Sequence, residues 1–172
     1  MRVIAVILTI VLSCTILPVL AYQDTLQIGD KAPDIALPSP KGDTISLSSF
    51  AGKLVLIDFW ANWCAPCVKE QPVLAALYKK YRQATFSCGK GFEIYGVSLD
   101  NKKDLWVKGI RQLGIEWPQV SDLKFWASPI AESYGVEELP YNMLLNGDGT
   151  IIAQNLHDEQ LESFIRSLVI SR

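Results

Sequence analysis

Two cysteines, Cys64 and Cys67, stand two residues apart directly after an apolar run, and they constrain the fold more than any other feature. The run, residues 54–60, has the continuous apolar content of a strand buried on both faces. Residues 68–83 have helical spacing, so the sequence predicts a helix with Cys64 at or near its N-terminus. There the helix dipole and unpaired backbone N–H groups favour a thiolate. The pair is therefore expected to close and open a disulfide readily.

A second buried strand is predicted over residues 92–99, which gives the order strand, helix, strand. That order implies a parallel βαβ unit and an α/β fold. Residues 22–52 are rich in Pro, Gly, Asp and Ser and predict an N-terminal extension with a short strand at 44–47. The other predicted elements are helices over 102–113 and 128–134, strands over 141–146 and 150–154, and a closing helix over 158–169 capped by Asp158.

The composition is that of one ordinary globular domain. The chain has 172 residues, of which 49% are hydrophobic and 20% charged. Its 16 Lys and Arg against 18 Asp and Glu give a net charge of −2 without a basic cluster, so a nucleic-acid partner is not expected. We expect residues 22–172 to form a single domain.

The first 21 residues differ from the rest, because Arg2 precedes a nearly uncharged apolar run that reaches Leu20. This pattern predicts a signal peptide, and the run is also long enough to remain as an uncleaved N-terminal membrane anchor. Cys14 is interpreted as a small apolar residue of this segment, with lipidation as the alternative. Either version exports the domain to the periplasm or cell envelope, with membrane contact only through this segment.

Two other roles of the cysteine pair would involve no redox turnover: a zinc site and a structural disulfide. A zinc site needs two more thiolates or imidazoles, and the chain offers one histidine, His157, and no second Cys-x-x-Cys, so no metal is expected. A purely structural disulfide in so short a loop stabilises little. If residues 1–21 are removed, Cys88 is left over, either as an idle thiol or as a second redox site.

Several motifs together resemble the thioredoxin superfamily and, within it, the exported TlpA- or ResA-like thiol-disulfide oxidoreductases. The resemblance spans residues 28–168 and is carried by the following stretches: Gly29 to Pro33, Asp58 to Cys67, Glu70 with Pro72, Gly96 to Asp100, and Leu139-Pro140. It implies a thioredoxin fold, with a central mixed sheet flanked by helices. It also implies an N-terminal β-hairpin extension of the AhpC/TSA-Redoxin type and a helical insertion before a hairpin that follows a cis proline.

The resemblance assigns the catalytic roles. Cys64 attacks a partner disulfide and Cys67 resolves the mixed disulfide. Asp58, a carboxylate inside an apolar strand, is expected to have a raised pKa and to exchange protons with Cys67, the alternative being an Asp satisfied by backbone donors. Glu70, one helical turn after Cys67, is expected to tune the pair or touch the partner, or else to be a solvated helix charge.

Substrate contacts are expected around the same motif. By the same resemblance, Leu139-Pro140 is expected to form a cis peptide bond whose preceding backbone pairs with an extended substrate strand. Trp63, with Ala65 and Pro66 between the cysteines, is expected to contact substrate. Trp60 is expected to be a core residue. Core or local packing is expected for the other tryptophans: Trp106, Trp117 and Trp126. His157 is expected to be a surface or capping residue.

The predicted function is exchange with protein disulfides or thiols, in the reductive direction, with envelope redox homeostasis or the maturation of c-type cytochromes as roles that the resemblance suggests. No cofactor is expected, and a membrane thiol-reductase is the implied electron donor. One alternative is a thiol peroxidase, because the stretch from Gly29 to Leu37 is shared with peroxiredoxins. A second alternative is a non-catalytic module that binds peptides at the cis proline.

Overall fold

A five-stranded sheet forms the centre of the computed structural model, which describes residues 25–170. The expected signal or anchor segment, residues 1–21, and Cys14 within it lie outside the described residues. In spatial order the strands are β7 (Gln119–Val120), β6 (Phe92–Ser98), β3 (Leu54–Trp60), β8 (Tyr141–Leu145) and β9 (Ile151–Gln154). The first three run parallel and the last two are antiparallel to their neighbours, so the predicted mixed sheet is confirmed.

Strand β3 is the innermost element, and all seven of its residues are buried. Its neighbours on both sides satisfy its backbone, as expected for a continuous apolar run. Asp58 is the exception to its apolar content, and it pairs in register with Gly96 on β6 and Asn142 on β8. The Asp58 carboxylate is thereby fixed in the central strand of the sheet.

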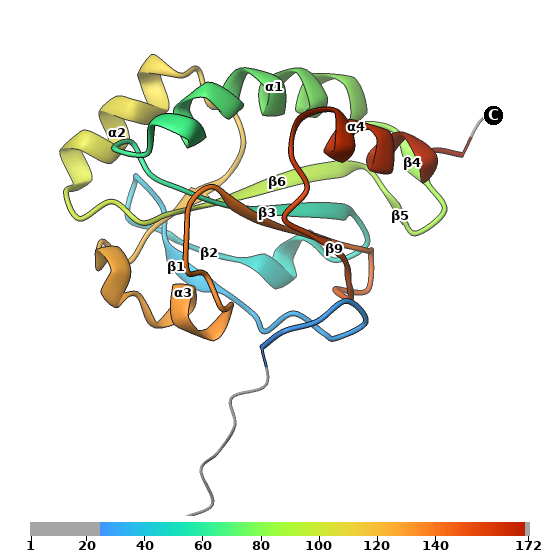
Figure 1. Ribbon diagram of the computed structural model, residues 1–172, viewed down its shortest axis with the longest axis horizontal. Coiled ribbons are helices and arrows are strands. Elements are labelled where there is room, and N and C mark those ends of the chain that lie inside the picture. Colours follow the sequence, from blue (N-terminus) through green and yellow to red (C-terminus); the bar gives the residue numbers. More distant parts are fainter. Residues whose placement is uncertain (1–24, 171–172) are drawn as a thin grey trace, which may run out of the picture.

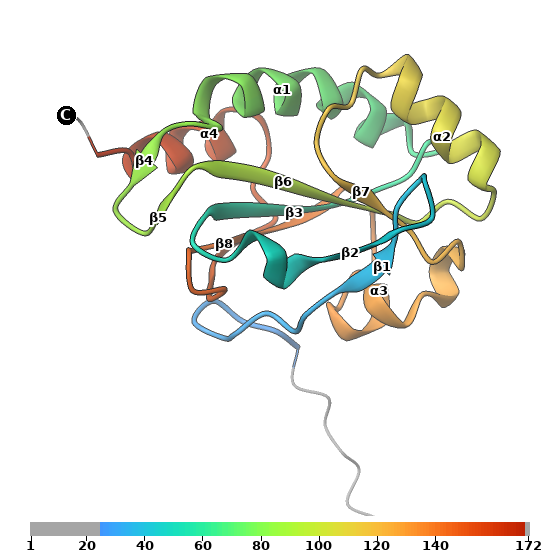
Figure 2. The same ribbon diagram turned by 180° about the vertical axis from the view of Figure 1, so that it is seen from behind.

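Helices and a hairpin cover the two faces of the sheet (Figures 1 and 2). One face carries α1 (Ala65–Tyr81), α2 (Lys103–Gln112) and α4 (Asp158–Ser167). The other carries α3 (Pro129–Ser133), the hairpin of β1 (Ala36–Pro38) and β2 (Thr44–Ser46), and the 3₁₀ turn η1 (Leu47–Phe50). The predicted α/β class, the N-terminal hairpin and the flanking helices are confirmed. None of the helices within residues 25–170 has the length and apolar content needed to cross a membrane.

The N-terminal extension also contacts both outer strands of the sheet. Beside β9, the Ala32 N–H donates to the Gly149 carbonyl at 3.0 Å and the Ile151 N–H donates to the Asp30 carbonyl at 2.9 Å. At the other edge, the Ser121 N–H, directly after β7, donates to the Pro38 carbonyl of β1 at 3.1 Å. The extension is therefore hydrogen-bonded to the sheet on both sides.

Three short strands differ from the predictions. Strand β7 lies inside the region predicted to hold helices only, and a hairpin of β4 (Thr85–Phe86) and β5 (Gly89–Lys90) occupies a segment predicted as loop. Each of these strands has two residues, which is too short to show an alternation of apolar and polar positions.

Helix boundaries differ by a few residues. Helix α1 begins at Ala65 rather than at residue 68, because Pro66 suits the first turn, where its missing N–H leaves no bond unmade. The predicted cap of α4 is wrong: the N-cap is His157, and Asp158 is the first helical residue, with φ of 47°. Asp158 and Glu159 instead place negative charge in the first turn, where the helix dipole favours it.

Candidate active site

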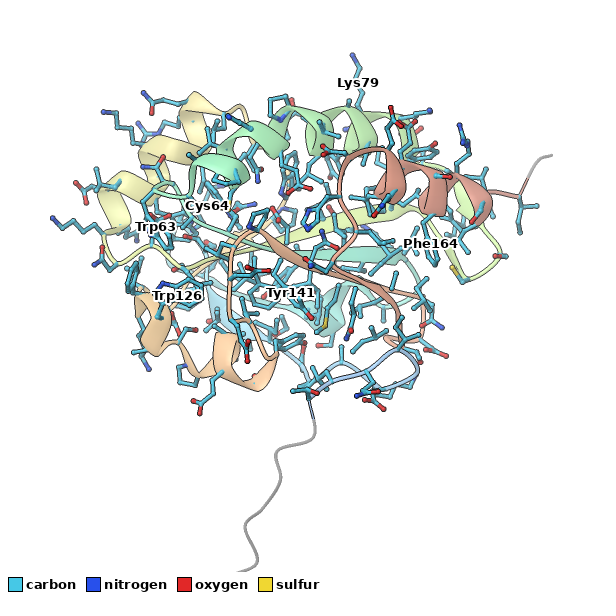
Figure 3. The ribbon with its side chains drawn as sticks, in the orientation of Figure 1. Trp63, Cys64, Lys79, Trp126, Tyr141 and Phe164 are labelled. Carbon is cyan, nitrogen blue, oxygen red and sulfur yellow. A yellow bond between two sulfur atoms is a disulfide. The ribbon has the colours of Figure 1, made fainter. Side chains whose placement is uncertain are left out.

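Cys64 and Cys67 form a disulfide at the start of α1, with a Cα–Cα distance of 5.3 Å. Figure 3 labels Cys64 beside Trp63. Cys64 is the N-cap residue, and its Sγ accepts the backbone N–H of Cys67 at 3.2 Å. Exposure is 5% for Cys64 and 1% for Cys67. The predicted position at a helix N-terminus is confirmed, and this position supplies a backbone donor and the positive end of the dipole to the first sulfur.

The turn before the cysteines is held by a buried carboxylate from the neighbouring strand. Asp100, directly beyond β6, accepts the backbone N–H of Asn62 at 3.0 Å and the hydroxyl of Ser98 at 2.8 Å. Asp100 is 3% exposed, so these bonds lie in a protected environment. The contact fixes the backbone two residues before Cys64.

Asp58 lies beneath the buried face of α1. The Gln71 side chain, one turn after Cys67 on that face, donates from Nε2 to Asp58 Oδ2 at 3.1 Å. Burial raises the pKa of Asp58 from its ordinary 3.8 to about 7; the Gln71 hydrogen bond lowers it, the charge of Glu70 raises it and that of His157 lowers it. Its carboxyl group therefore changes charge near neutral pH, as expected of a group that exchanges protons there.

Glu70 is paired with the single histidine of the chain. Its Oε1 lies 2.8 Å from His157 Nδ1, and His157 Nε2 lies 2.9 Å from Asn155 Oδ1. Both ring nitrogens of His157 therefore have a polar partner. Glu70 is only 7% exposed, so the alternative of a solvated helix charge is wrong. His157 is the N-cap residue of α4, as the expectation of a surface or capping residue allows, and its side chain also pairs with Glu70.

A small pocket of about 260 Å³ opens between the start of α1 and the loop before β8. The Leu139-Pro140 peptide bond at this rim is cis, as predicted. Within residues 25–170, neither the N–H nor the carbonyl of Leu139 makes a backbone hydrogen bond, and pairing of β8 with β3 begins only at Tyr141. The pocket is lined by Pro66, Lys69, Glu70, Pro140, His157 and Asp158.

The charges around Asp58 predict opposite effects of two substitutions. Glu70→Gln removes a negative charge and should lower the pKa of Asp58, whereas His157→Gln removes a positive one and should raise it. Carbon NMR titration of the Asp58 carboxyl group measures both shifts. Glu162→Gln, an exposed carboxylate paired with Lys80 on another part of the surface, is the matched control and should leave the titration unchanged. Shifts of the same sign in both variants would contradict this electrostatic account.

The side chains flanking the cysteines are exposed. Trp63 is 45% exposed and packs against Phe125, with ring centroids 5.1 Å apart. Ala65 and Pro66 are also exposed, whereas Trp60 is fully buried and donates from Nε1 to Gln119 Oε1 at 2.8 Å. Trp63, Ala65 and Pro66 are therefore open to a partner, and Trp60 is a core residue as predicted.

The third cysteine of the described residues is remote from this chemistry. Cys88 lies in the turn between β4 and β5, half-buried, and its burial raises the pKa of the thiol. A raised pKa disfavours the nucleophilic thiolate, so the idle thiol is the better interpretation. Within residues 25–170, no group of three His, Cys, Asp or Glu side chains is arranged to hold a metal ion.

A comparison with protein families matches residues 28–154 to the model described as the AhpC/TSA family. The chain belongs to this family. Among curated members, "Thiol-disulfide oxidoreductase ResA" of Bacillus thuringiensis (strain Al Hakam) is 34% identical over 86% of this chain and 82% of its own length. The protein of the same description from Bacillus subtilis (strain 168) is 31% identical over 78% of this chain and 70% of its own.

Solved structures agree with the family. The thioredoxin domain of a thiol-disulfide oxidoreductase from Bacteroides vulgatus matches with a TM-score of 0.75 and 34% identity, over 83% of this chain and 98% of that one. The family members and the disulfide at the start of α1 together identify this chain as a thiol-disulfide oxidoreductase with a thioredoxin-like fold.

Proposed function

We propose that this protein reduces disulfides in polypeptide partners outside the cytoplasm. The observation that carries the proposal is the Cys64–Cys67 disulfide at the N-terminus of α1, with a buried carboxyl group, Asp58, behind it. Cys64, as the N-cap, is the nucleophile of the dithiol form, and Cys67, the more buried of the two, resolves.

The reaction proceeds in two exchanges. The Cys64 thiolate attacks one sulfur of the partner disulfide, which forms a mixed disulfide and releases the first partner thiol. Cys67 then loses its proton and attacks Cys64 Sγ, which forms the protein disulfide and releases the second partner thiol. Asp58 is the proposed base for the proton of Cys67, because a pKa of about 7 lets it accept a proton at neutral pH and return it.

Glu70 and His157 are proposed to position this chemistry rather than to react. Their pair links the start of α1 to the segment before α4 and sets the charge around Asp58. The partner polypeptide is proposed to lie across the exposed Trp63, Ala65 and Pro66, and to hydrogen-bond the free backbone of Leu139 beside Pro140.

The proposal also covers where the domain is located and which donor supplies its electrons. Residues 1–21 are proposed to export the domain, residues 22–172, to the periplasm or cell envelope, either as a cleaved signal or as an anchor. After each turnover the protein disulfide must regain two electrons, and outside the cytoplasm a membrane thiol-reductase is the proposed donor. Envelope redox homeostasis and the supply of reduced thiols for c-type cytochromes are the proposed roles.

The reduction potential of the Cys64/Cys67 couple tests the direction. We expect a value near about −270 mV, at the reducing end of this superfamily, when the full chain is equilibrated in detergent with dithiothreitol buffers. A value near about −120 mV would make the protein an oxidant and contradict the proposal. Hydrogen peroxide consumption with dithiothreitol, measured beside it, tests the peroxidase alternative and should stay at the rate of buffer. A couple that no dithiol reduces would favour the non-catalytic binding module.

A further inference from the structure

Three aromatic side chains form an exposed cluster beside the nucleophilic cysteine. Trp63, directly before Cys64, packs against Phe125 and Trp126 of the 3₁₀ turn η2 (Phe125–Ala127), with ring centroids 5.1 and 6.2 Å apart. The three are 45%, 38% and 40% exposed respectively. Figure 3 shows Trp63 and Trp126 together on the same side of the molecule as Cys64, far from Phe164. We call these three residues the aromatic cluster.

The backbone of Phe125 has an unfavourable conformation. Its φ is 57°, in the left-handed region that a bulky side chain rarely adopts and that glycine adopts freely. Its side chain is nevertheless not buried in the core, so packing in the interior does not account for it. A strained residue that is kept at the surface beside a reactive group points to a functional role.

The loop that carries Phe125 is braced. Ser121 donates its hydroxyl to the Ser98 carbonyl at the end of β6 at 2.8 Å, and Ser128 donates its hydroxyl to Asp122 at 2.7 Å. The backbone N–H of Lys124 donates to the other oxygen of Asp122 at 3.0 Å. These bonds tie both ends of the turn, so the aromatic cluster is held in place before any partner arrives.

The position of the aromatic cluster beside Cys64 indicates that a substrate polypeptide covers it during thiol-disulfide exchange. A partner bonded to Cys64 through its own sulfur lies close to Trp63, the residue directly before Cys64, whose side chain is exposed. Beyond Trp126 the surface continues into a hollow of about 930 Å³ along α3, lined in part by Pro129 and Glu132. The occupant is therefore a polypeptide segment that leaves the reacting cysteine on this side, and aromatic rings favour apolar and aromatic side chains on it.

We propose that the aromatic cluster of Trp63, Phe125 and Trp126 selects substrates that carry an aromatic residue next to the reacting cysteine, with Phe125 as the specificity-determining residue. This inference rests on the proposed reduction of polypeptide disulfides and names the class of its substrate. One contact between an aromatic residue of the substrate and the aromatic cluster corresponds to a preference of about 3- to 10-fold in the rate of reduction.

Symmetric peptide disulfides test the proposal. Each probe is a homodimer of an uncharged peptide with one cysteine, which bears Trp before it, Trp after it, or Ser on both sides. The full chain, reduced and freed of dithiothreitol, takes one homodimer to two peptide thiols while its own dithiol becomes a disulfide, so atoms and electrons balance. We expect at least one Trp peptide to react about 5-fold faster than the Ser peptide.

Phe125→Gly should reduce that ratio to about one and, because glycine relieves the left-handed backbone, raise the melting temperature by about 2–4 °C. Trp126→Ser should reduce the ratio as well. Ile28→Ala, an exposed apolar residue in the N-terminal extension, is the control and should keep the full preference.

Equal rates for all peptides in the natural chain would overturn the inference, as would a preference that survives in Phe125→Gly. Self-association of the full chain that Phe125→Gly abolishes would assign the aromatic cluster to a second copy and would overturn it too. Failure of the proposed function would give a different result. In that case the natural chain would reduce none of the peptides faster than the Cys64→Ser variant does.

Discussion

Cys64→Ser should abolish the reduction of insulin disulfides and leave only the rate of the dithiothreitol in the assay. A serine hydroxyl is not ionised near neutral pH, so the first exchange loses its nucleophile, and Cys67, 1% exposed, is too buried to replace it. The measurement is the onset of turbidity as reduced insulin chains precipitate. Turnover close to that of the natural chain in this variant would remove Cys64 from the mechanism.

The partner substitution gives the complementary result. Cys67→Ser keeps the nucleophile but removes the resolving thiol, so the mixed disulfide with the substrate should accumulate as a species of higher mass on non-reducing gels. Cys88→Ser is the matched control, because its thiol is half-buried in the turn between β4 and β5 and should not take part. A trapped complex that needs Cys88 would assign that thiol the role of second redox site.

Asp58→Asn should make the fold more stable above neutral pH. The folded chain binds the Asp58 proton with a pKa of about 7, against 3.8 as the ordinary value. Between these values the folded state holds more protons than the unfolded state, so the stabilisation present below pH 3.8 is lost as pH rises through 7. The difference of about 3 pKa units corresponds to about 4 kcal/mol.

Asparagine has nearly the same shape and never ionises, so the free energy of unfolding in urea should rise by about 2–4 kcal/mol at pH 8 and change little at pH 4. Asp148→Asn is a useful control, because that exposed carboxyl has its pKa lowered to about 2 by Lys31 and Thr150 and should give no stabilisation at pH 8. An equal effect of Asp58→Asn at both pH values would show that Asp58 does not titrate in this range.

The same substitution should slow catalysis. Without a base behind Cys67, resolution of the mixed disulfide at pH 7 should fall by about 10²-fold, and the inflection near pH 7 in the rate profile should vanish. A variant that is both more stable and less active would show that the buried carboxyl group is kept for its chemistry.

The sequence predicts most of the central architecture because the decisive signals are local. The apolar run of β3 and the cysteines that follow define a strand and a helix start within about a dozen residues, and the predicted position of Cys64 is confirmed. The burial of Asp58 follows equally from its apolar neighbours in sequence. Features that depend on one short stretch of chain are therefore the ones that could be predicted.

Features that depend on distant residues could not be predicted. Glu70 and His157 are 87 positions apart in the chain, and nothing in either local sequence indicates that they meet. Trp126 was expected to pack in the core or locally, and it does pack against its neighbour Phe125. Its 40% exposure and its contact with Trp63, which is far away in the sequence, had no local signal. Phe125, the residue before Trp126, has a left-handed backbone that nothing in the sequence indicates, because bulky residues rarely adopt it.

The hydrogen bonds of the N-terminal extension also determine where a foreign polypeptide can attach. Unpaired sheet edges act as templates for any extended chain. Here Gly29 and Asp30 bond to Ile151 at the start of β9, and Pro38 bonds to Ser121, directly after the two-residue strand β7. Because both edges are partly covered, the backbone of Leu139 at the reactive rim, which makes no backbone hydrogen bond within residues 25–170, is the proposed point of strand addition.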